Sequence, residues 1–347
     1  MSSATGGLTV AVTGPTGEIG KPFVRALDRT DAVERIVGMA RRPFDPYREG
    51  LKKVEYLQGD ILDRSSVQRL VDGADVVVHL AFLIFDDTEE ARSINLEGSR
   101  NVFEETFAAG ADRLVYASSV AAYGFHRDNP EVLTEDVEAR GSANHYYSRQ
   151  KADVEKLLGN LADGATTDVY VFRPCIVAGA DATALIDRIP YVRIAQKLPD
   201  AIVNVAGKLP MLRPVIPDPG VPVQLVHHDD VASALIAAVM GTGSPGAYNL
   251  AGDGRITLTD LAHALGWYAV PLPDIAVNAT AGIVSRMPYL PVEATWVNAV
   301  KVPVLVDCTK AKKELGWQPR HDALDTLSDT IAAARARGKL PWPGGIG

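Results

Sequence analysis

The stretch that most constrains the fold lies near the start of the chain, at Leu8–Gly20. Its first residues, Leu8 to Val12, are mostly apolar and β-branched, which predicts a buried strand of a parallel sheet. A glycine turn follows, and the residues from Glu18 to Leu27 have the apolar spacing of an amphipathic helix. The turn contains three glycines in a G-x-x-G-x-x-G pattern, namely Gly14, Gly17 and Gly20.

A strand, a tight glycine turn and a helix N-terminus can together hold a pyrophosphate. Glycines let the ligand approach the backbone, and the free N–H groups and the helix dipole favour negative charge. A purely structural turn between a strand and a helix could use the same glycines, so their spacing alone leaves both interpretations open. The strand before the turn and the helix after it favour nucleotide binding.

Composition excludes several classes of protein. The chain has 347 residues, enough for a large core and for two domains or one domain with an added lobe. The net charge is −8 without a basic stripe, which argues against a nucleic-acid partner. Cys175 and Cys308 are far apart without metal-like spacing, which fits a reducing compartment. Because no signal-peptide pattern or membrane-spanning run is found, we expect a cytoplasmic protein without a membrane partner.

Apolar strand-like runs alternate with amphipathic segments over the first half of the chain, which predicts a parallel sheet covered by helices on both faces. We expect an α/β fold, a Rossmann-type doubly wound parallel sheet with a smaller mixed α/β C-terminal substrate lobe. Strands are predicted at residues 8–12, 35–40, 54–57, 75–80, 113–117 and 168–172, and long helices at 88–109 and 146–161.

The alternation is lost after Arg173-Pro174, where prolines become frequent. We therefore assign residues 1–174, with about 223–250, to a nucleotide-binding domain. Residues 175–222 and 251–347 are assigned to the substrate lobe. The last seven residues, 341–347, have the composition of a mobile or lid-like tail.

A tyrosine and a lysine form the first candidate for chemistry, because Tyr147 and Lys151 are four residues apart on a predicted helix and share one face. At roughly 4 Å and an effective dielectric of about 20, an ammonium stabilises a phenolate by about 4 kcal/mol. Such a pair would lower the pKa of Tyr147 from about 10 toward about 7, where it can exchange a proton with a substrate oxygen. An ordinary surface pair on a helix is the alternative.

Two serines form the second candidate. Ser118 and Ser119 directly follow a predicted strand, and polar residues at the carboxyl ends of parallel strands face the ligand crevice. A hydroxyl there can hydrogen-bond a carbonyl oxygen and stabilise developing charge. A cap for a turn or helix is the alternative.

These motifs occur in an order that resembles the extended short-chain dehydrogenase/reductase family, the NAD-dependent epimerase/dehydratase group. The resemblance covers nearly the whole chain and is weakest at about residues 180–220 and 270–300. Its motifs are Gly14-x-x-Gly17-x-x-Gly20, Asp60-Ile61, His79-Leu80-Ala81, Asn95 with Gly98, Ser118-Ser119 with Tyr123-Gly124, Tyr147-x-x-x-Lys151, Arg173-Pro174, His227 to Ala232 and Leu315 to Pro319.

The resemblance implies hydride transfer between nicotinamide C4 and the carbon of a carbonyl or secondary alcohol, with the cofactor carrying the chemistry. Tyr147 would be the acid/base and Ser119 would polarise the oxygen. Lys151 would hold the nicotinamide ribose and tune Tyr147. Asn95 would support the catalytic site, unless it is only a polar contact of its helix. The expected cofactor-binding residues are Gly14, Thr16, Gly17, Glu18, Ile19, Gly20, Arg41, Arg42, Asp60, Ile61, Leu80, Ala81, Lys151, Pro174 and Ile176.

The end of the second predicted strand bears on the choice of cofactor. An acidic residue there would bind the ribose 2′-OH of NAD, whereas this chain has Ala40-Arg41-Arg42. Because arginines suit a 2′-phosphate by charge and by their forked donors, we expect NADP(H), with NAD as the alternative. Solvated loop charges, or arginines stacked on the adenine, would also explain the pair.

Two further departures bear on the substrate. Ile176 and Val223 stand where sugar-nucleotide members of the family carry an asparagine and an arginine. Their loss removes polar anchors for a diphosphate, so we expect a small-molecule ketone or alcohol that is weakly charged. A charge from unmatched positions would weaken that argument, and the candidates are Arg188, Arg193, Lys197 and Arg213.

Three functions therefore compete. The first is an NADP(H)-dependent oxidoreductase, and the second is a sugar-nucleotide epimerase or dehydratase with tightly bound NAD. The third, a non-catalytic dinucleotide sensor, would need a broken Ser-Tyr-Lys set, and here the set is intact. No metal is expected, because the adjacent His227 and His228 lack metal-ligand geometry and read as structural. By analogy with similar proteins, we expect a homodimer formed through the helices at 88–109 and 146–161.

Overall fold

The computed structural model describes residues 6–84, 86, 88–187, 189, 192, 213–271 and 302–340. Its centre is a seven-stranded sheet in which every neighbouring pair is parallel. In spatial order the strands are β10 (Gly246–Leu250), β6 (Asp168–Pro174), β5 (Arg113–Ala117), β4 (Val76–His79), β1 (Leu8–Thr13), β2 (Val33–Ala40) and β3 (Val54–Gln58). The chain runs outward in opposite directions from β1 and β4, as in a Rossmann fold, which confirms the predicted fold class.

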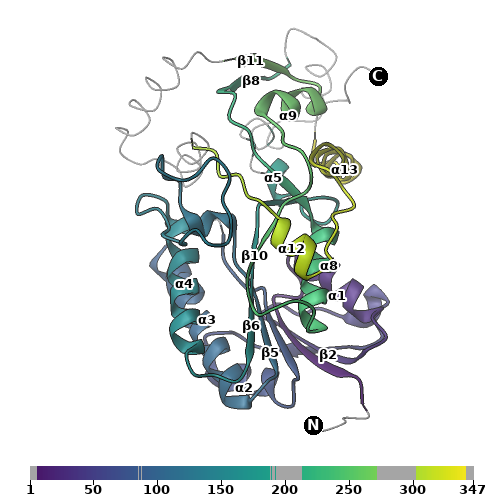
Figure 1. Ribbon diagram of the computed structural model, residues 1–347. Coiled ribbons are helices and arrows are strands. Elements are labelled where there is room, and N and C mark those ends of the chain that lie inside the picture. Colours follow the sequence, from purple (N-terminus) through teal and green to yellow (C-terminus); the bar gives the residue numbers. More distant parts are fainter. Residues whose placement is uncertain are drawn as a thin grey trace.

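Helices cover both faces of the sheet (Figure 1). One face carries α2 (Arg64–Val71), α3 (Glu89–Ala109) and α4 (Tyr146–Ala162), and the other carries α1 (Gly20–Asp28) and α8 (His228–Val239). Strand β4 shows why both layers form: Val76 and Val78 belong to the core under α1 and α8, whereas Val77 belongs to the core under α2, α3 and α4. Successive side chains of a strand point to opposite faces, so a continuous apolar strand requires two covers.

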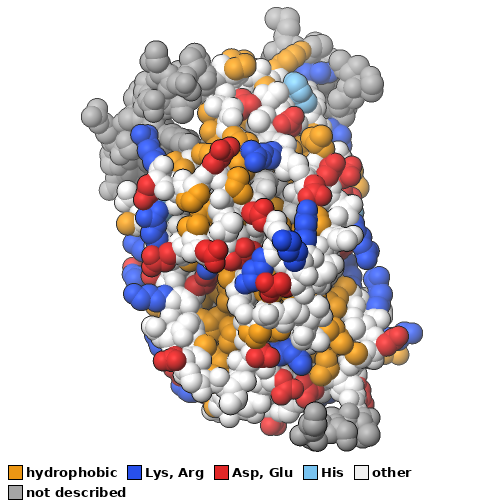
Figure 2. Space-filling model, in the orientation of Figure 1, with side chains coloured by type: hydrophobic (Ala, Val, Ile, Leu, Met, Phe, Trp, Pro, Cys, Tyr) orange, Lys and Arg blue, Asp and Glu red, His pale blue; other side chains and the backbone are white. Residues whose placement is uncertain are grey.

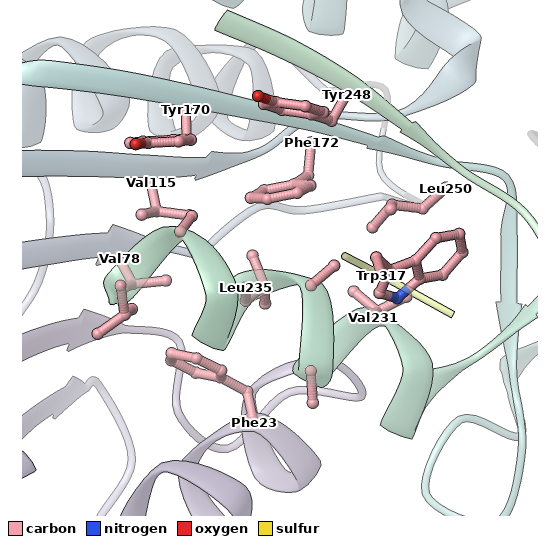
Figure 3. Close-up of a cluster of buried hydrophobic side chains, with 14 of the residues drawn as sticks. Phe23, Val78, Val115, Tyr170, Phe172, Val231, Leu235, Tyr248, Leu250 and Trp317 are labelled. Atoms are coloured by element: carbon pink, nitrogen blue, oxygen red, sulfur yellow. The ribbon is translucent and has the colours of Figure 1, made fainter. Parts of the chain in front are cut away.

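The core beneath α8 is drawn in Figure 3. Helix α8 lies between the sheet and α1, with its Leu235 below Phe172 of β6 and its Val231 beside Trp317. Phe23 of α1 closes the opposite side of the helix. Because α1 starts at the glycine turn, this packing fixes the helix whose N-terminus faces the candidate nucleotide site.

The smaller lobe lies beyond the carboxyl edge of the sheet (Figure 1). It contains two parallel two-stranded sheets, β7 (Ile176–Ala178) with β9 (Leu225–His227) and β8 (Val215–Asp218) with β11 (Tyr268–Pro271). Its apolar core is shared by α9 (Leu258–Leu265), α13 (Ala323–Ala336) and the short α5 (Ala184–Asp187). Helix α12 (Thr309–Glu314) packs on β10 instead, so the C-terminal part of the chain contacts both the lobe and the sheet.

Several element bounds differ from the prediction. The helix expected from Glu18 begins at Gly20, because Ile19 is its N-cap. Within residues 223–250, which we assign to the nucleotide-binding domain, β9 pairs with β7 rather than with the main sheet. Helix α9, which starts with a capping box of Thr257 and Asp260, was not predicted. The predicted tail at 341–347 and three of the candidate cations, Arg188, Arg193 and Lys197, lie outside the described residues.

The distribution of charged side chains on the surface agrees with the absence of a basic stripe in the sequence. On the face in Figure 2, basic and acidic side chains are intermixed and do not gather into a single-sign stripe. In the described part of the chain, no helix combines the length and the apolar character needed to cross a bilayer.

Candidate functional site

The glycine turn lies where the carboxyl ends of β1 and β4 meet. Gly14 has a φ of +70°, and a Cβ there would lie 2.9 Å from the backbone nitrogen of Ala81. A Cβ on Gly20 would overlap the carbonyl oxygen of Gly14. A Cβ on Gly17 would meet only that same oxygen, at 3.4 Å. Gly14 and Gly20 are therefore needed for packing, whereas Gly17 leaves open space above the turn.

The N-terminus of α1 fits a pyrophosphate. No side chain caps this helix, and the backbone N–H groups of Glu18 and Ile19 have no acceptor among the described residues. Thr16 and Gly17 are exposed beside them. Uncapped N–H groups at a helix start, next to a glycine that leaves room, form an anion site of the kind that dinucleotides use.

Thr13 and His79 join the two strands at this edge. The Thr13 hydroxyl lies 2.7 Å from His79 Nδ1 and accepts the N–H groups of Leu80 and Ala81 at 3.1 and 3.2 Å. His79 Nε2 lies 3.0 Å from the hydroxyl of Ser99, which itself donates to the Asn95 carbonyl. His79 therefore donates at Nε2 and accepts at Nδ1, as a neutral imidazole, and complete burial lowers its pKa to about 3.

The residues that we expect to contact the adenosine half of the cofactor follow β2 and β3. Arg41 and Arg42 are exposed directly after β2, and among the described residues neither forms an ion pair. Their backbone carbonyls accept from the side chains of Gln58 and Tyr56, which fixes the loop but leaves both guanidinium groups available. Past β3, Asp60 is half-buried, and Ile61 packs so closely on Gly98 that a Cβ there would lie 2.5 Å from Ile61 Cδ1.

Ser119 and Tyr147 come together, although they are distant in sequence. The Ser119 hydroxyl lies near enough to the Tyr147 phenol to lower its pKa, and each residue is 8% exposed. The same Ser119 oxygen accepts the Ala121 N–H at 3.1 Å and so caps the short 3-10 helix η2 (Val120–Tyr123). The cap interpretation of Ser119 is therefore confirmed, and the polarising role of its hydroxyl stays a prediction.

The predicted fall in the pKa of Tyr147 is wrong for this structure. Burial of the phenol raises its pKa to about 12, and only the hydrogen bond from Ser119 works against that rise. Lys151 Nζ lies 6.0 Å from the Tyr147 ring centroid, and its ammonium is not among the causes that set the pKa of this phenol. Desolvation therefore controls the pKa of Tyr147, and the side chain is a neutral phenol.

Lys151 is 2% exposed and faces the same site. Its Nζ donates to the Ala117 carbonyl at 2.8 Å and to the Tyr116 hydroxyl at 3.3 Å, and it lies 3.7 Å from the centroid of the Phe82 ring. Burial lowers its pKa to about 7, and the charge of Glu155 partly offsets that effect.

Glu155 is itself occupied, one turn farther along α4. It forms a buried ion pair with Arg173 at 2.6 Å and accepts the Ser118 hydroxyl. Arg173 also lies over the Tyr123 ring, with the guanidinium carbon 4.6 Å from the centroid. These contacts connect α4 to the end of β6. They therefore help to fix the position of the helix that carries Tyr147 and Lys151.

Asn95 bonds to the segment after β4 and to α4, and its predicted role in supporting the site stays a prediction. It is fully buried, and its side chain bonds both the N–H and the carbonyl of Leu83, at 2.8 and 2.9 Å. It also donates to Gln150 at 2.7 Å, between Tyr147 and Lys151 on α4.

The Glu18 side chain is engaged within the protein. Its carboxylate accepts the N–H of Ala184 at 2.9 Å, and burial raises its pKa. The side chain therefore joins the glycine turn to the start of α5 in the smaller lobe, and only its backbone remains for the cofactor. Pro174 is buried at the end of β6, whereas Ile176 is 40% exposed and Val223 is half-buried.

An apolar cluster around Tyr147 was not predicted. Ala121 and Tyr146 pack with Tyr147, and three partly buried side chains join them, namely Phe82, Ile84 and Phe125. Phe82 meets Tyr147 edge to face, with ring centroids 5.8 Å apart. The apolar run after β4 was visible in the sequence, but nothing local indicated that it would lie against α4.

His227 and His228 pair with their surroundings as neutral rings. Together with Asp229 they offer donor atoms within 4.8 Å of one another, a spacing that could admit a metal ion. However, His227 Nδ1 accepts the Asp229 N–H, and His228 Nε2 accepts the Asp181 N–H. The remaining nitrogens contact the carboxylates of Asp329 and Asp229. Every ring nitrogen is therefore engaged in holding the chain, as the structural interpretation expects.

Comparisons with known proteins agree with this geometry. A protein of Sinorhizobium fredii designated y4nG is 26% identical over 335 residues, which span 93% of this chain and 77% of that protein. The ceramide reductase of Caulobacter vibrioides is 25% identical over 354 residues, which span 96% of both. The fold matches the crystal structure of the Bordetella bronchiseptica enzyme WbmH in complex with NAD+, with a TM-score of 0.68, 20% identity and coverage of 95% of this chain and 99% of that one.

The family model confirms the resemblance drawn from the motifs. The model described as the NAD dependent epimerase/dehydratase family matches residues 10–251, from the middle of β1 to just past β10. This span is well over half of the chain and contains the glycine turn, the Ser119–Tyr147 pair and Lys151. The chain therefore belongs to the NAD-dependent epimerase/dehydratase family, and its fold is that of this family's oxidoreductases.

Proposed function

We propose that this protein is an NADP(H)-dependent oxidoreductase that interconverts a ketone and a secondary alcohol. The observation that carries the proposal is the proximity of the Ser119 and Tyr147 hydroxyl groups at the carboxyl edge of the sheet. Two neighbouring hydroxyl groups can together surround a single substrate oxygen. Such an oxygen receives hydrogen bonds from both hydroxyls as negative charge develops on it.

Tyr147 supplies the proton in the reducing direction. Its raised pKa, about 12, keeps the phenol protonated at neutral pH, so it carries the proton that the reduction requires. Ser119 stabilises the oxygen while Tyr147 protonates it. In the oxidising direction the phenolate form of Tyr147 receives the alcohol proton and becomes the phenol again. The bound nicotinamide supplies or accepts the hydride.

Lys151 and Asn95 organise the site. Lys151 presents a buried ammonium within the same helix as Tyr147, where it would bind the nicotinamide ribose and favour negative charge on the neighbouring phenol. Asn95 fixes the segment after β4 against α4 through Leu83 and Gln150. Gly14, Gly17 and Gly20 would hold the pyrophosphate at the N-terminus of α1.

The arginines after β2 support NADP(H). Arg41 and Arg42 are exposed, follow Ala40 at the end of β2, and form no ion pair among the described residues. A 2′-phosphate would neutralise them and accept their forked N–H groups. NAD would offer only a hydroxyl at that place.

An apolar substrate is supported by the walls around Tyr147. Phe82, Ile84 and Phe125 surround the phenol, and exposed Ile176 follows β6. Removing apolar surface from water gains roughly 25 cal/mol per Å², so such walls favour a hydrocarbon part of the substrate over a diphosphate. The related Caulobacter vibrioides protein named ceramide reductase fits a reductase of an apolar compound.

Purified protein with NADPH and a panel of apolar and polar ketones tests the proposal. We expect oxidation of NADPH with an apolar ketone, and loss of that activity in Tyr147→Phe. Incubation with UDP- and dTDP-sugars forms the second arm. Conversion of such a sugar without net change in the cofactor, by protein that retains NAD through gel filtration, would replace the proposal with an epimerase or dehydratase.

We also propose a homodimer formed by the outer faces of α3 and α4. These helices pack together on one face of the sheet and leave their far sides uncovered by other described elements (Figure 1). Light scattering at several concentrations measures the mass, and a stable monomer at high concentration would contradict this part of the proposal.

A further inference from the structure

The Lys151 ammonium is buried without a carboxylate partner among the described residues. It has three N–H donors, and two of them are directed to the Ala117 carbonyl and the Tyr116 hydroxyl. Glu155, the nearby acid, is engaged by Arg173 and Ser118. A charge with so few neutral partners is costly to keep in a closed site, because burial favours the uncharged amine.

The Phe82 ring provides the remaining contact. Its centroid lies 3.7 Å from Lys151 Nζ, whereas the Tyr116 and Tyr147 ring centroids lie 5.0 and 6.0 Å away. The face of an aromatic ring carries negative electrostatic potential, and a cation over it is stabilised most strongly where water is excluded. Among the described residues, Phe82 therefore presents the aromatic ring face nearest to this ammonium.

The backbone around Phe82 is fixed on both sides. Thr13 accepts the N–H of Ala81, directly before it. Asn95 bonds both backbone groups of Leu83, directly after it, and the Tyr146 hydroxyl donates to the Ile84 carbonyl. These contacts come from β1, α3 and α4, so three elements hold one short segment over Lys151. A ring held this firmly can act as a constant part of the site.

Other groups around Lys151 do not duplicate this contact. On α4, Tyr147 is neutral and Glu155 is paired with Arg173. On β5, burial raises the pKa of Tyr116 well above its usual value, so this phenol is also neutral. On β4, His79 is a neutral imidazole bonded to Thr13 and Ser99. Phe82 thus supplies an electrostatic stabilisation that none of these titratable groups provides in the same place.

We propose that Phe82 is a positioning residue of the reaction, whose ring face holds the Lys151 ammonium in place and keeps it cationic. The proposal rests on the oxidoreductase function proposed above, since it assigns Lys151 a role in binding the cofactor and in supporting Tyr147. A substitution that preserves the shape of the ring but weakens its negative face should make Lys151 lose its proton at lower pH.

Stepwise fluorination of Phe82 tests the electrostatic role in the cofactor-free protein. Phenylalanines with one, two and three ring fluorines are incorporated at position 82, and the Lys151 side chain is observed by ¹³C NMR of labelled lysine, with Lys151→Met to assign its resonance. We expect the pKa of Lys151 to fall with each fluorine, by about one unit in total, as a desolvated cation–π contact implies. The same series at Phe125, which lies in the same apolar cluster but against His145, should leave Lys151 unchanged.

A pKa of Lys151 that is unchanged across the series would overturn the proposal. Phe82→Leu and Phe82→Tyr are the second set of variants, in case the fluorinated proteins are unstable. We expect Phe82→Leu to lower the pKa of Lys151 as far as trifluorination does, and Phe82→Tyr to preserve that pKa. Equal pKa values of Lys151 in the two variants would also overturn the proposal.

Steady-state assays then separate this inference from the proposed function. If the protein reduces a ketone, the alkaline limb of kcat should move with the pKa of Lys151 across the fluorinated series, while the KM for the ketone stays constant. If no ketone or alcohol is turned over but the NMR titrations still move, the proposed function fails and the Phe82–Lys151 contact stands. If turnover is found and neither pH dependence moves, the function stands and the role of Phe82 is wrong.

Discussion

Asn95 and Gln150 lie on different helices and are joined by a hydrogen bond of 2.7 Å between Nδ2 and Oε1. The bond connects α3 to α4 at Gln150, which lies between Tyr147 and Lys151 in the sequence. Asn95 also bonds both backbone groups of Leu83, so one amide connects two helices to the segment that follows β4. The position of the reacting side chains thus depends on a residue that does not face the substrate oxygen.

Asn95→Leu should destabilise the protein and slow turnover. It leaves the backbone groups of Leu83 and the Gln150 amide without their buried partner, and each unsatisfied group costs about 1–3 kcal/mol. We expect the free energy of unfolding, measured in urea, to fall by about 3 kcal/mol. Asn101→Leu is the matched control on the same helix, since it loses chiefly a bond to the Ile61 carbonyl. Equal losses for both variants would contradict the role of Asn95.

Tyr147→Phe should lower kcat for ketone reduction by about 10³-fold, because it removes the proton donor but retains the ring. Ser119→Ala should lower kcat by about 10²-fold, since one donor to the developing oxyanion is lost. Tyr170→Phe deletes a hydroxyl that donates to the Gly243 carbonyl, far along the chain from the pair, and controls for the loss of any buried phenol. Stopped-flow single turnovers separate the chemical step from release of product. Turnover by Tyr147→Phe within tenfold of the parent would argue against its assignment as the acid.

The double variant Arg41→Ala/Arg42→Ala should change the choice of cofactor. Charge-assisted hydrogen bonds to a phosphate contribute about 1.5–3 kcal/mol, so the KM for NADPH should rise about 10- to 100-fold. The KM for NADH should change little, because its ribose offers no phosphate at that place. Arg48→Ala, an exposed arginine of the same loop region with a partner in Asp45, is the control. A parallel rise for both cofactors would show that the pair does not read the 2′-phosphate.

Acid should destabilise the fold through His79. Its pKa is about 3 in the folded protein and about 6.5 when unfolded, so the unfolded chain takes up the proton first as the pH falls. The stabilisation is complete above pH 6.5 and is lost progressively toward pH 3, with a loss of about 2 kcal/mol at pH 5. Urea unfolding at pH 7.5, 6 and 5 measures it.

Two variants isolate this contribution from that of other acidic groups. His79→Gln lowers stability at every pH. Below pH 6.5, however, its free energy of unfolding should fall less steeply than that of the parent protein, and the two slopes should differ by about 1.4 kcal/mol per pH unit. Ser99→Ala removes a partner of His79 Nε2 and keeps the imidazole, so it should retain the steeper slope. Identical slopes in His79→Gln and the parent protein would refute the assignment.

Local patterns in the sequence determined the glycine turn, the succession of strands along the chain and the types of side chain at the candidate site. The glycines could be interpreted because their steric freedom is a property of the residue itself, and the run Val76–His79 because continuous apolar character requires cover on both faces. Tyr147 and Lys151 could be placed together because residues four apart lie on one side of a helix.

Tertiary structure decided the distances and the burial. The pKa of Tyr147 depends on how deeply α4 is packed and on where Lys151 Nζ ends, and neither follows from their spacing along the chain. Phe82 reaches Lys151, and Thr13 reaches His79, only because separate strands and helices meet at one edge of the sheet. Desolvation and contacts between remote segments belong to the packed molecule, because a side chain loses water only when other parts of the chain replace it.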